Sequence, residues 1–477
     1  MDVVSNLFHV LFVFSLAYYA ISAMQWYSYK IERVLFHYHR YSWHIFYALI
    51  PIIGFYLLPT PWVFGWIILY VGALFLWART LDKKLVFTPR VKRFFLFLFL
   101  ALLFQGLLCS IVFECQKNGV IIPLLIAHLF SIVFEKIAFE GFKKEARKKL
   151  RECSHTKVIA ITASYGKTSI KNFLAHILSS SYNVYATPRS VNTLGGIVKD
   201  INESLPLESD VYIVEAGARQ KGDIDEIARF IHPHICIVGC IGEQHIEYFK
   251  TLETIRNTKM ELLNSNRLEK AFVHVSAHVK PYATVQLFGN DIEDIEATLN
   301  GTAFTLNIHG SKERFTCKLL GDFNAINLAA AIHVALYLGL PLETIKKAVE
   351  ELKGVPHRLQ KIEAGGKVII DDSFNGNLEG MLSSYTLIES YKGRKVIVTP
   401  GIIESTPEAN QTLAQAIDAI FDVVILTGKA NVILLDSMIK RPQKFILEDK
   451  SGLQALLAEQ THKGDVILFS NDAPSFI

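Results

Sequence analysis

The chain has 477 residues, of which 51% are hydrophobic and 20% are charged, and its formal net charge is +4. This length suits about three domains, and the small positive charge gives no reason to expect nucleic acid as a partner. Six cysteines without a CxxC pair predict reduced thiols and exclude an obvious zinc site or disulfide framework.

Residues 1–140 hold most of the hydrophobic excess. The apolar runs lie near 6–27, 43–59, 61–78, 94–113 and 120–138. Each approaches the roughly 20 residues that a helix needs to cross a bilayer. Basic residues gather between alternate runs, at Lys30, Arg33 and Arg40, between 79 and 93, and in KKEARKKLR at 143–151. Five spans with the N-terminus outside put all three groups in the cytoplasm, as the positive-inside rule requires.

From residue 156 onwards, apolar strands alternate with helices. The expected strands are VIAI (158–161), VYAT (184–187), VYIVEAG (211–217), ICIVGC (235–240) and AFVHV (271–275). Such alternation predicts a parallel sheet with helices on both faces, and ligands that gather at the carboxyl ends of its strands. The segments FTLNIHG (304–310) and RFTCKLL (314–320) indicate a small antiparallel insertion, and an apolar helix is expected at 323–338.

GVPHR at 354–358 interrupts this pattern, and a second alternation follows from KVIIDD (367–372) to DVILFS (465–470). We therefore expect four parts: a membrane region at 1–140, a basic linker at 141–155, a central α/β domain at 156–354 and a C-terminal α/β domain at 355–477.

The octapeptide TASYGKTS (162–169) follows the strand VIAI and precedes an amphipathic stretch, IKNFLAHILSS. A strand, a tight loop and a helix in this order form a phosphate site, in which backbone N–H groups face the anion, a lysine neutralises it and a hydroxyl holds Mg²⁺. Lys167 would contact the phosphates and Thr168 the metal. Ala163 stands where a glycine is usual, which would cost on the order of 1 kcal/mol if its φ were positive.

Three further residues lie near the strand ends. Glu215 ends one strand, His245 follows the next, and Lys259 lies on the helix after that. In a doubly wound sheet these positions converge on the phosphate loop, where a carboxylate and an imidazole are suitable metal ligands. Each residue alone also has a commoner role: a helix cap, a solvated histidine and a surface lysine.

Together these segments resemble the Mur ligases, the ATP-dependent amide-forming enzymes of peptidoglycan synthesis. TASYGKTS is similar to the family's TGxxGKT[ST] loop, and VPHRLQ to its VPGRL segment. The other similar segments are TPRSVNTLGGI (187–197), VEAGA with GDID (214–225), HIEYF with IRNTKMELL (245–263), GDFNAINLAAAIHVA (321–335) and IIDDSFNGN (369–377). VPHRLQ and IIDDSFNGN together are nearest to the branch that adds D-alanyl-D-alanine to a UDP-muramoyl tripeptide.

The resemblance implies a P-loop ATPase domain, a C-terminal Rossmann-like domain, and ATP and Mg²⁺ as cofactors. The implied catalytic residues are Lys167, His245 and Lys259. The implied metal ligands are Thr168, Glu215, His245 and a carbamylated Lys259. The implied ATP-binding residues are Ala163, Ser164, Tyr165, Gly166, Lys167, Thr168, Ser169, Asn324, Asn327, Arg358 and Asp372. The implied substrate-binding residues are Asn192, Thr193, Ser373, Asn375 and Asn377.

The implied reaction is the phosphorylation of a carboxylate by ATP, followed by attack of an amine on the acyl phosphate. The family's N-terminal domain, which holds the UDP end of the substrate, has no counterpart, and apolar runs stand in its place. TPGIIESTPEAN (399–410) also departs from the branch's GDMxELG segment. The expected location is the inner membrane of a bacterium, with the catalytic domains in the cytoplasm.

Two substrates remain open, the soluble UDP-muramoyl tripeptide and a lipid-linked muramoyl peptide at the membrane surface. The expected partners are these substrates, D-alanyl-D-alanine, the lipid bilayer and other cell-wall synthesis enzymes. A membrane scaffold of the cell-wall machinery with an inactive site is a further alternative. A transporter driven by an attached ATPase is another, although no coupling signature supports it.

Overall fold

The structure is a computed structural model that describes residues 3–27, 29, 31, 34, 41–81, 83–109, 111, 119–243, 246–374, 376–403, 405–429 and 431–471. The chain forms two compact units, residues 1–141 and residues 142–477. Each unit is described by itself below.

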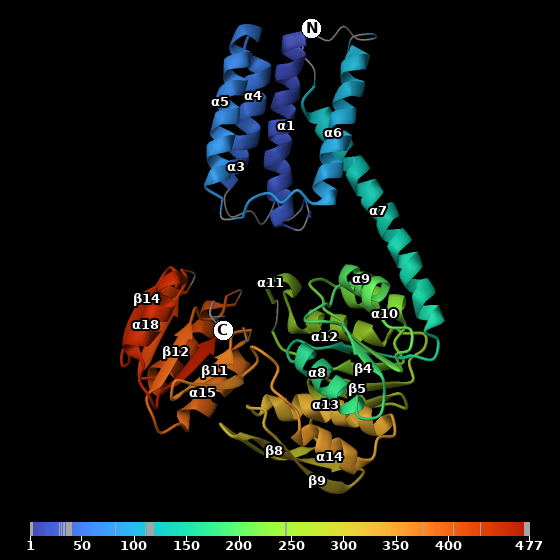
Figure 1. Ribbon diagram of the computed structural model, residues 1–477, viewed down its shortest axis with the longest axis vertical. Coiled ribbons are helices and arrows are strands. Elements are labelled where there is room, and N and C mark those ends of the chain that lie inside the picture. Colours follow the sequence, from blue (N-terminus) through green and yellow to red (C-terminus); the bar gives the residue numbers. More distant parts are fainter. Residues whose placement is uncertain are drawn as a thin grey trace. The chain divides into compact units, whose positions relative to one another are not determined.

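The first unit is helical (Figure 1). Its helices are α1 (Val3–Trp26), α3 (Tyr41–His44), η1 (Ile45–Leu49), α4 (Ile50–Leu57), α5 (Thr60–Arg79), α6 (Pro89–Leu108) and the part of α7 (Ile121–Glu152) up to residue 141. Helices α1, α5, α6 and α7 are long and apolar enough to cross a membrane, and residues 41–57 form a shorter apolar helix. A π-helical turn directly precedes Pro51 in that shorter helix, where proline has no N–H to donate.

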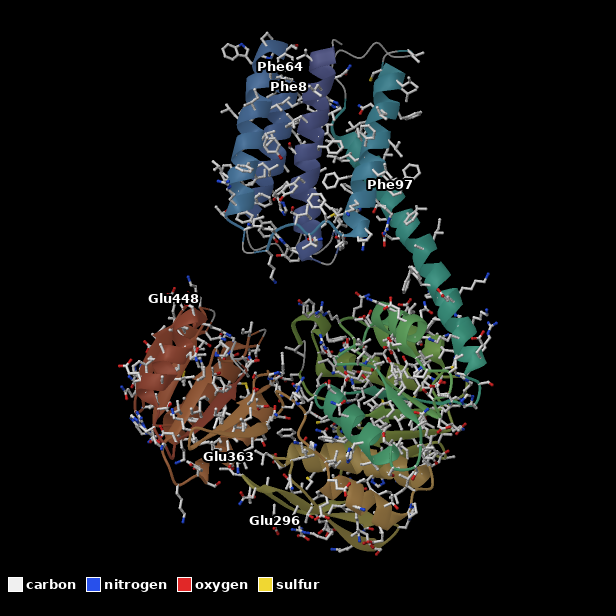
Figure 2. The ribbon with its side chains drawn as sticks, in the orientation of Figure 1. Phe8, Phe64, Phe97, Glu296, Glu363 and Glu448 are labelled. Atoms are coloured by element: carbon white, nitrogen blue, oxygen red, sulfur yellow. The ribbon has the colours of Figure 1, made fainter. Side chains whose placement is uncertain are left out.

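The first unit is apolar on its surface as well as in its core. On α5, Ile67 is fully buried, whereas its neighbours Ile68 and Leu69 are 59% and 69% exposed. Inside the unit, the rings of Phe8 and Phe64 lie side by side with centroids 4.8 Å apart (Figure 2). Helices of this kind need apolar surroundings on their outer face.

The expectation of six reduced cysteines is wrong at Cys109, which is disulfide-bonded. The remaining cysteine of the first unit, Cys115, lies outside the described residues. The cysteines of the second unit are free thiols, at Cys153, Cys236, Cys240 and Cys317.

The central sheet of the second unit confirms the predicted parallel α/β pattern. Its strands are β1 (Lys157–Thr162), β2 (Val184–Ala186), β3 (Val211–Glu215), β4 (Ile235–Val238), β5 (Lys270–His274) and β6 (Val285–Phe288), in the spatial order β2-β3-β1-β4-β5-β6. All neighbouring pairs are parallel. The sequence reasoning did not include β6.

Helices follow the strands of this sheet. They are α8 (Lys167–Leu178), α9 (Leu194–Ser204), α10 (Asp223–Ile231), α11 (Ile246–Phe249), α12 (Leu252–Met260) and the 3₁₀ turns η3 (Glu261–Leu263) and η4 (Val275–Ala277). Two more helices, α13 (Phe323–Tyr337) and α14 (Leu342–Glu350), come after the predicted antiparallel insertion. That insertion is confirmed as a sheet of β7 (Ile292–Thr298), β8 (Gly301–Ile308) and β9 (Ser311–Cys317).

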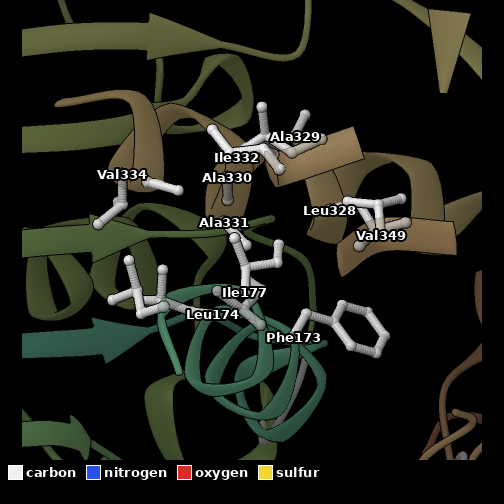
Figure 3. Close-up of a cluster of buried hydrophobic side chains, with 14 of the residues drawn as sticks. Phe173, Leu174, Ile177, Leu328, Ala329, Ala330, Ala331, Ile332, Val334 and Val349 are labelled. Carbon is white, nitrogen blue, oxygen red and sulfur yellow. The ribbon is translucent and has the colours of Figure 1, made fainter. Parts of the chain in front are cut away.

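The core beneath the phosphate loop joins α8 to α13 (Figure 3). Phe173, Leu174 and Ile177 of α8 belong to one hydrophobic cluster with Leu328 and the alanines at 329–331 of α13, and all of these side chains are almost fully buried. Alanine side chains let the two helices approach closely, because little volume separates their backbones. This packing fixes the direction of α8 and therefore the position of its N-terminus.

The C-terminal sheet confirms a second α/β alternation. Its strands are β10 (Gln360–Ala364), β11 (Lys367–Asp372), β12 (Lys395–Thr399), β13 (Val423–Thr427), β14 (Gln443–Leu447) and β15 (Val466–Ser470), in the order β10-β11-β15-β12-β13-β14. Only the edge strand β10 is antiparallel among these pairs. Its helices are α15 (Leu378–Glu389), α16 (Pro407–Ile420), α17 (Val432–Met438), η5 (Lys450–Gly452) and α18 (Leu453–Gln460).

Candidate active site

The loop between β1 and α8 is clamped to the end of β4. The Ser164 N–H donates to the Cys240 carbonyl at 2.8 Å, and Ser164 Oγ donates to the Gly242 carbonyl at 2.9 Å. Gly166 precedes α8 with φ +79°, and a Cβ built there would lie 2.3 Å from Asn327 Oδ1. The left-handed backbone and the close approach of α13 both require glycine at this position.

Ala163 departs from the expected glycine without strain. Its φ is not positive, and its methyl group is fully buried. A Cβ added to Gly239 would lie 2.9 Å from the Ala163 methyl group. The alanine therefore fits because its neighbour directly after β4 is a glycine, and the backbone penalty considered above does not arise.

Lys167 is the first residue of α8, and its ammonium turns back to the loop. Nζ donates to the Ala163 carbonyl at 2.7 Å and to the Ser164 carbonyl at 3.2 Å. Burial lowers the pKa of Lys167 to about 8, Glu215 opposes this shift and Arg358 adds to it. The amides of the first helical turn have no partners within a helix, so this end of α8 attracts anions.

Glu215, at the end of β3, is fully buried between two side chains of α8. Its Oε2 accepts from Thr168 Oγ1 at 3.3 Å, and its Oε1 lies 2.9 Å from Lys171 Nζ. That ion pair is close, although no donor points at Oε1 in hydrogen-bonding orientation. Lys171 Nζ also donates to the carbonyls of Thr187 at 2.6 Å and Arg189 at 2.5 Å.

Lys171 was missed by the sequence reasoning, although the sequence contains a signal for it. It lies four residues after Lys167 and three before Leu174, so it shares the buried face of α8. A lysine on the apolar face of a helix needs buried partners for its charge. Here those partners are one carboxylate and two backbone carbonyls.

The pKa of Lys259 is lowered well below its usual value, first by burial and then by Lys167. Its side chain is 2% exposed, on α12. An uncharged lysine amine can react with CO₂ to form a carbamate. His245, expected beside it, lies outside the described residues. Within the described ranges there is no group of three or more His, Cys, Asp or Glu residues suited to a metal.

Two asparagines of α13 border the loop. The side chain of Asn327 lies against Gly166, because a Cβ at Gly166 would come within 2.3 Å of Asn327 Oδ1. Asn324 is buried, and its Nδ2 donates to the Leu320 carbonyl at 2.7 Å. The Asn324 Oδ1 atom has no hydrogen-bond partner, so a buried acceptor remains for a bound donor.

Arg358 and Asp372 come from the start of the C-terminal domain. Arg358 donates to the Phe374 carbonyl. Burial lowers the pKa of Arg358, while Asp372 and then Glu215 raise it. Asp372 is 1% exposed, and its Oδ1 accepts from the Leu359 N–H at 3.1 Å. Arg358 thus lies within electrostatic range of the carboxylate that faces the phosphate loop.

The residues expected to bind substrate also have structural partners. Thr193 caps α9 by accepting from the Gly196 N–H at 3.3 Å, and Asn377 caps α15 by accepting from the Gly380 N–H at 2.8 Å. Ser373 Oγ donates to Asp371.

Asn192 lies at the end of β3, because its carbonyl accepts from the Gly217 N–H at 2.8 Å. Asn375 lies outside the described residues.

Residues 161–335 match the family model described as the Mur ligase middle domain. This stretch of the chain is therefore similar to the central domain of the Mur ligases. The chain is 28% identical over 336 residues to the UDP-N-acetylmuramoyl-tripeptide--D-alanyl-D-alanine ligase of Bacillus subtilis (strain 168), which covers 66% of this chain and 72% of that protein. The enzyme of the same name from Escherichia coli (strain K12) is 28% identical over 302 residues, 59% of this chain and 66% of that protein.

The fold of this chain is also similar to that of solved structures. It is similar to the MurF ligase of Thermotoga maritima in complex with ADP, with a TM-score of 0.61, 24% identity, and coverage of 69% of this chain and 80% of that one. The chain thus spans about two thirds to three quarters of the length of the two curated relatives named above. The expected resemblance to the Mur ligases is confirmed.

Proposed function

We propose that this protein is an ATP-dependent ligase that joins D-alanyl-D-alanine to UDP-N-acetylmuramoyl-tripeptide, with release of ADP and phosphate. The observation that carries the proposal is the phosphate loop whose helix α8 presents Lys167 and Thr168 beside buried Glu215. The relatives from B. subtilis and E. coli have this activity in their names.

The residues present fit the cofactors. Glu215 is a buried carboxylate beside the Thr168 hydroxyl, and Mg²⁺ prefers oxygen ligands such as these. Thr168 and Glu215 would hold one ion, and His245 with a carbamylated Lys259 would hold a second. When bound, Mg²⁺ neutralises charge on the transferring phosphoryl group.

The remaining proposed roles are the binding of ATP and of the two substrates by side chains and backbone amides of this chain. Lys167 and the first-turn amides of α8 bind the ATP phosphates, because both present positive charge to one point. Arg358 offsets negative charge at the phosphoryl group, and Asp372 holds the ribose. The tripeptide carboxylate attacks the γ-phosphate, and the amine of D-alanyl-D-alanine then displaces phosphate from the acyl phosphate. The remaining proposed contacts are Asn324 and Asn327 for adenine, and Asn192, Thr193, Ser373, Asn375 and Asn377 for substrate.

The proposal includes a location. The apolar helices of residues 1–140 would cross the inner membrane of a bacterium as a multi-pass region, and the central (156–354) and C-terminal (355–477) domains would lie in the cytoplasm. The exposed apolar side chains of α5 support a lipid environment, as Ile68 and Leu69 illustrate. The basic stretch 141–155 would lie on the cytoplasmic side.

The test uses the full-length protein in detergent with ATP, D-alanyl-D-alanine and UDP-N-acetylmuramoyl-tripeptide. We expect ADP release that requires both substrates, together with a product of matching mass, and loss of both in Lys167→Met. Turnover of a lipid-linked muramoyl tripeptide but not of the soluble nucleotide would replace the substrate in the proposal. No turnover of either substrate by folded protein would overturn the proposed activity and favour a scaffold.

A further inference from the structure

The ion pair of Lys171 and Glu215 is the most deeply buried pair of opposite charges in the described second unit, with both side chains at most 2% exposed. Taking two charges out of water is unfavourable unless every donor and acceptor finds a partner. The Lys171 ammonium donates to the carbonyls of Thr187 and Arg189, and Glu215 Oε1 lies 2.9 Å from its Nζ as the ion-pair partner. Its position is therefore fully determined by its surroundings.

We propose that Lys171 is a positioning residue that makes metal binding at Glu215 depend on the nucleotide. Lys171 neutralises Glu215 and occupies its Oε1 side, so that only Oε2 faces Thr168. This inference rests on the proposed function, since it concerns the Mg²⁺ ion that the ligase reaction uses. It adds a role for a residue to which the site described above assigns none.

The charges around the loop give the sign of the effect. Lys167, Lys171 and Arg358 are cationic, and Glu215 and Asp372 are the carboxylates that act on them. Before a carbamate forms on Lys259, their formal sum is positive, so this group of charges repels a free divalent cation. Bound ATP would bring several negative charges and reverse that sign, so Glu215 and Thr168 would hold the ion only together with the phosphates.

The contacts of Lys171 with the two carbonyls also connect it to the substrate loop, the segment between β2 and α9. Thr187 and Arg189 begin the segment that connects β2 to α9 and contains Asn192. The Thr187 Oγ1 atom also accepts from the Glu215 N–H at 3.4 Å. One ammonium thus ties the helix of the phosphate loop, the metal-binding carboxylate and the start of the substrate loop to each other.

The test measures Mn²⁺, as a stand-in for Mg²⁺, bound to nucleotide-free full-length protein by the loss of the free-ion electron paramagnetic resonance signal. In wild type we expect weak binding. In Lys171→Met we expect at least tenfold tighter binding and a melting temperature that rises with added Mn²⁺, because an unpaired buried carboxylate gains a counter-ion. Lys171→Arg, which keeps the charge, should bind as weakly as wild type.

Two control variants distinguish the effect of the lost Lys171 charge from an unspecific effect of substitution on the fold. Lys171→Met combined with Glu215→Gln should lose the gain in Mn²⁺ affinity, because no carboxylate remains. Lys199→Met removes a lysine whose partner Glu203 lies 3.7 Å away on the exposed face of α9, and it should bind Mn²⁺ as wild type does.

Tight Mn²⁺ binding by the nucleotide-free wild type would overturn the inference, and this measurement needs no variant to fold. Equal affinity in folded Lys171→Met and wild type would also overturn it. Neither measurement requires turnover, so failure here is distinct from failure of the proposed ligase reaction.

Discussion

Gly166→Ala tests whether the backbone of the phosphate loop is as constrained as its geometry indicates. Gly166 has φ +79°, and the new methyl group would be placed 2.3 Å from Asn327 Oδ1. Asn327 is 7% exposed on α13, whose packing against α8 leaves it little room to move. The substitution therefore combines a strained backbone with a steric conflict.

The two effects can be estimated separately. A left-handed conformation costs an alanine about 1–2 kcal/mol, and forcing the Asn327 side chain off its rotamer costs about 0.5–1.5 kcal/mol. The expected loss is therefore about 1.5–3.5 kcal/mol in the free energy of unfolding of the second unit. At about 2–4 °C per kcal/mol for a unit of more than 150 residues, the melting temperature should fall by about 3–14 °C.

Gly339→Ala is the matched control. Gly339 has φ +88° after α13, and a Cβ there meets nothing within 4 Å. This variant should show the backbone strain alone, so it should lose about half as much stability as Gly166→Ala. The assays are thermal melting and the binding of a fluorescent ATP analogue, which only Gly166→Ala should weaken. If Gly166→Ala melts no lower than Gly339→Ala, the close contact with Asn327 is not a constraint.

Two further predictions concern the lysines of the site. Lys259→Ala should lose ADP release, and short-chain carboxylic acids should restore part of it by replacing the carbamate; a variant that stays inactive at high acetate would count against carbamylation. The folded pKa of Lys167 is about 8 and its usual value is 10.5, so between these values the unfolded chain binds a proton that the folded chain does not. Stability at this site therefore rises with pH over that interval. The melting temperature of wild type should rise relative to that of Lys167→Met from pH 8 to 10, and parallel curves would contradict the lowered pKa.

The sequence predicts most of the fold because the side chains that become buried are apolar, and their spacing along the chain indicates strands and helices. Strands such as VIAI and ICIVGC are short apolar runs between turn residues, which is typical of strands covered on both faces. β6 (Val285–Phe288) was missed because it has four residues and only its two terminal residues are buried. Its parallel pairing with β5 depends on chain segments distant from it, and no local pattern encodes that pairing.

The candidate site was predictable in part, for a related reason. Glu215 and Thr168 meet because parallel strands end at one edge of the sheet, and the sequence shows where strands end. The sequence also contains the information that predicts helix caps at Thr193 and Asn377, since both residue types favour N-caps and both precede helices. The partners of Lys171 could not be predicted from the sequence, because they come from β3 and from a loop 16–18 residues further along the chain.

Departures from a family motif are therefore best judged by backbone conformation. Ala163 and His357 both stand where the similar family segments have glycine. Ala163 has an ordinary φ and needs no compensation, whereas His357 has φ +62°, which costs a non-glycine residue about 1–3 kcal/mol. His357 Nδ1 lies 2.7 Å from Oδ2 of fully buried Asp371, and its ring meets Phe374 edge-on. These contacts offset the strain and also fix the backbone that directs Arg358 towards the phosphate loop.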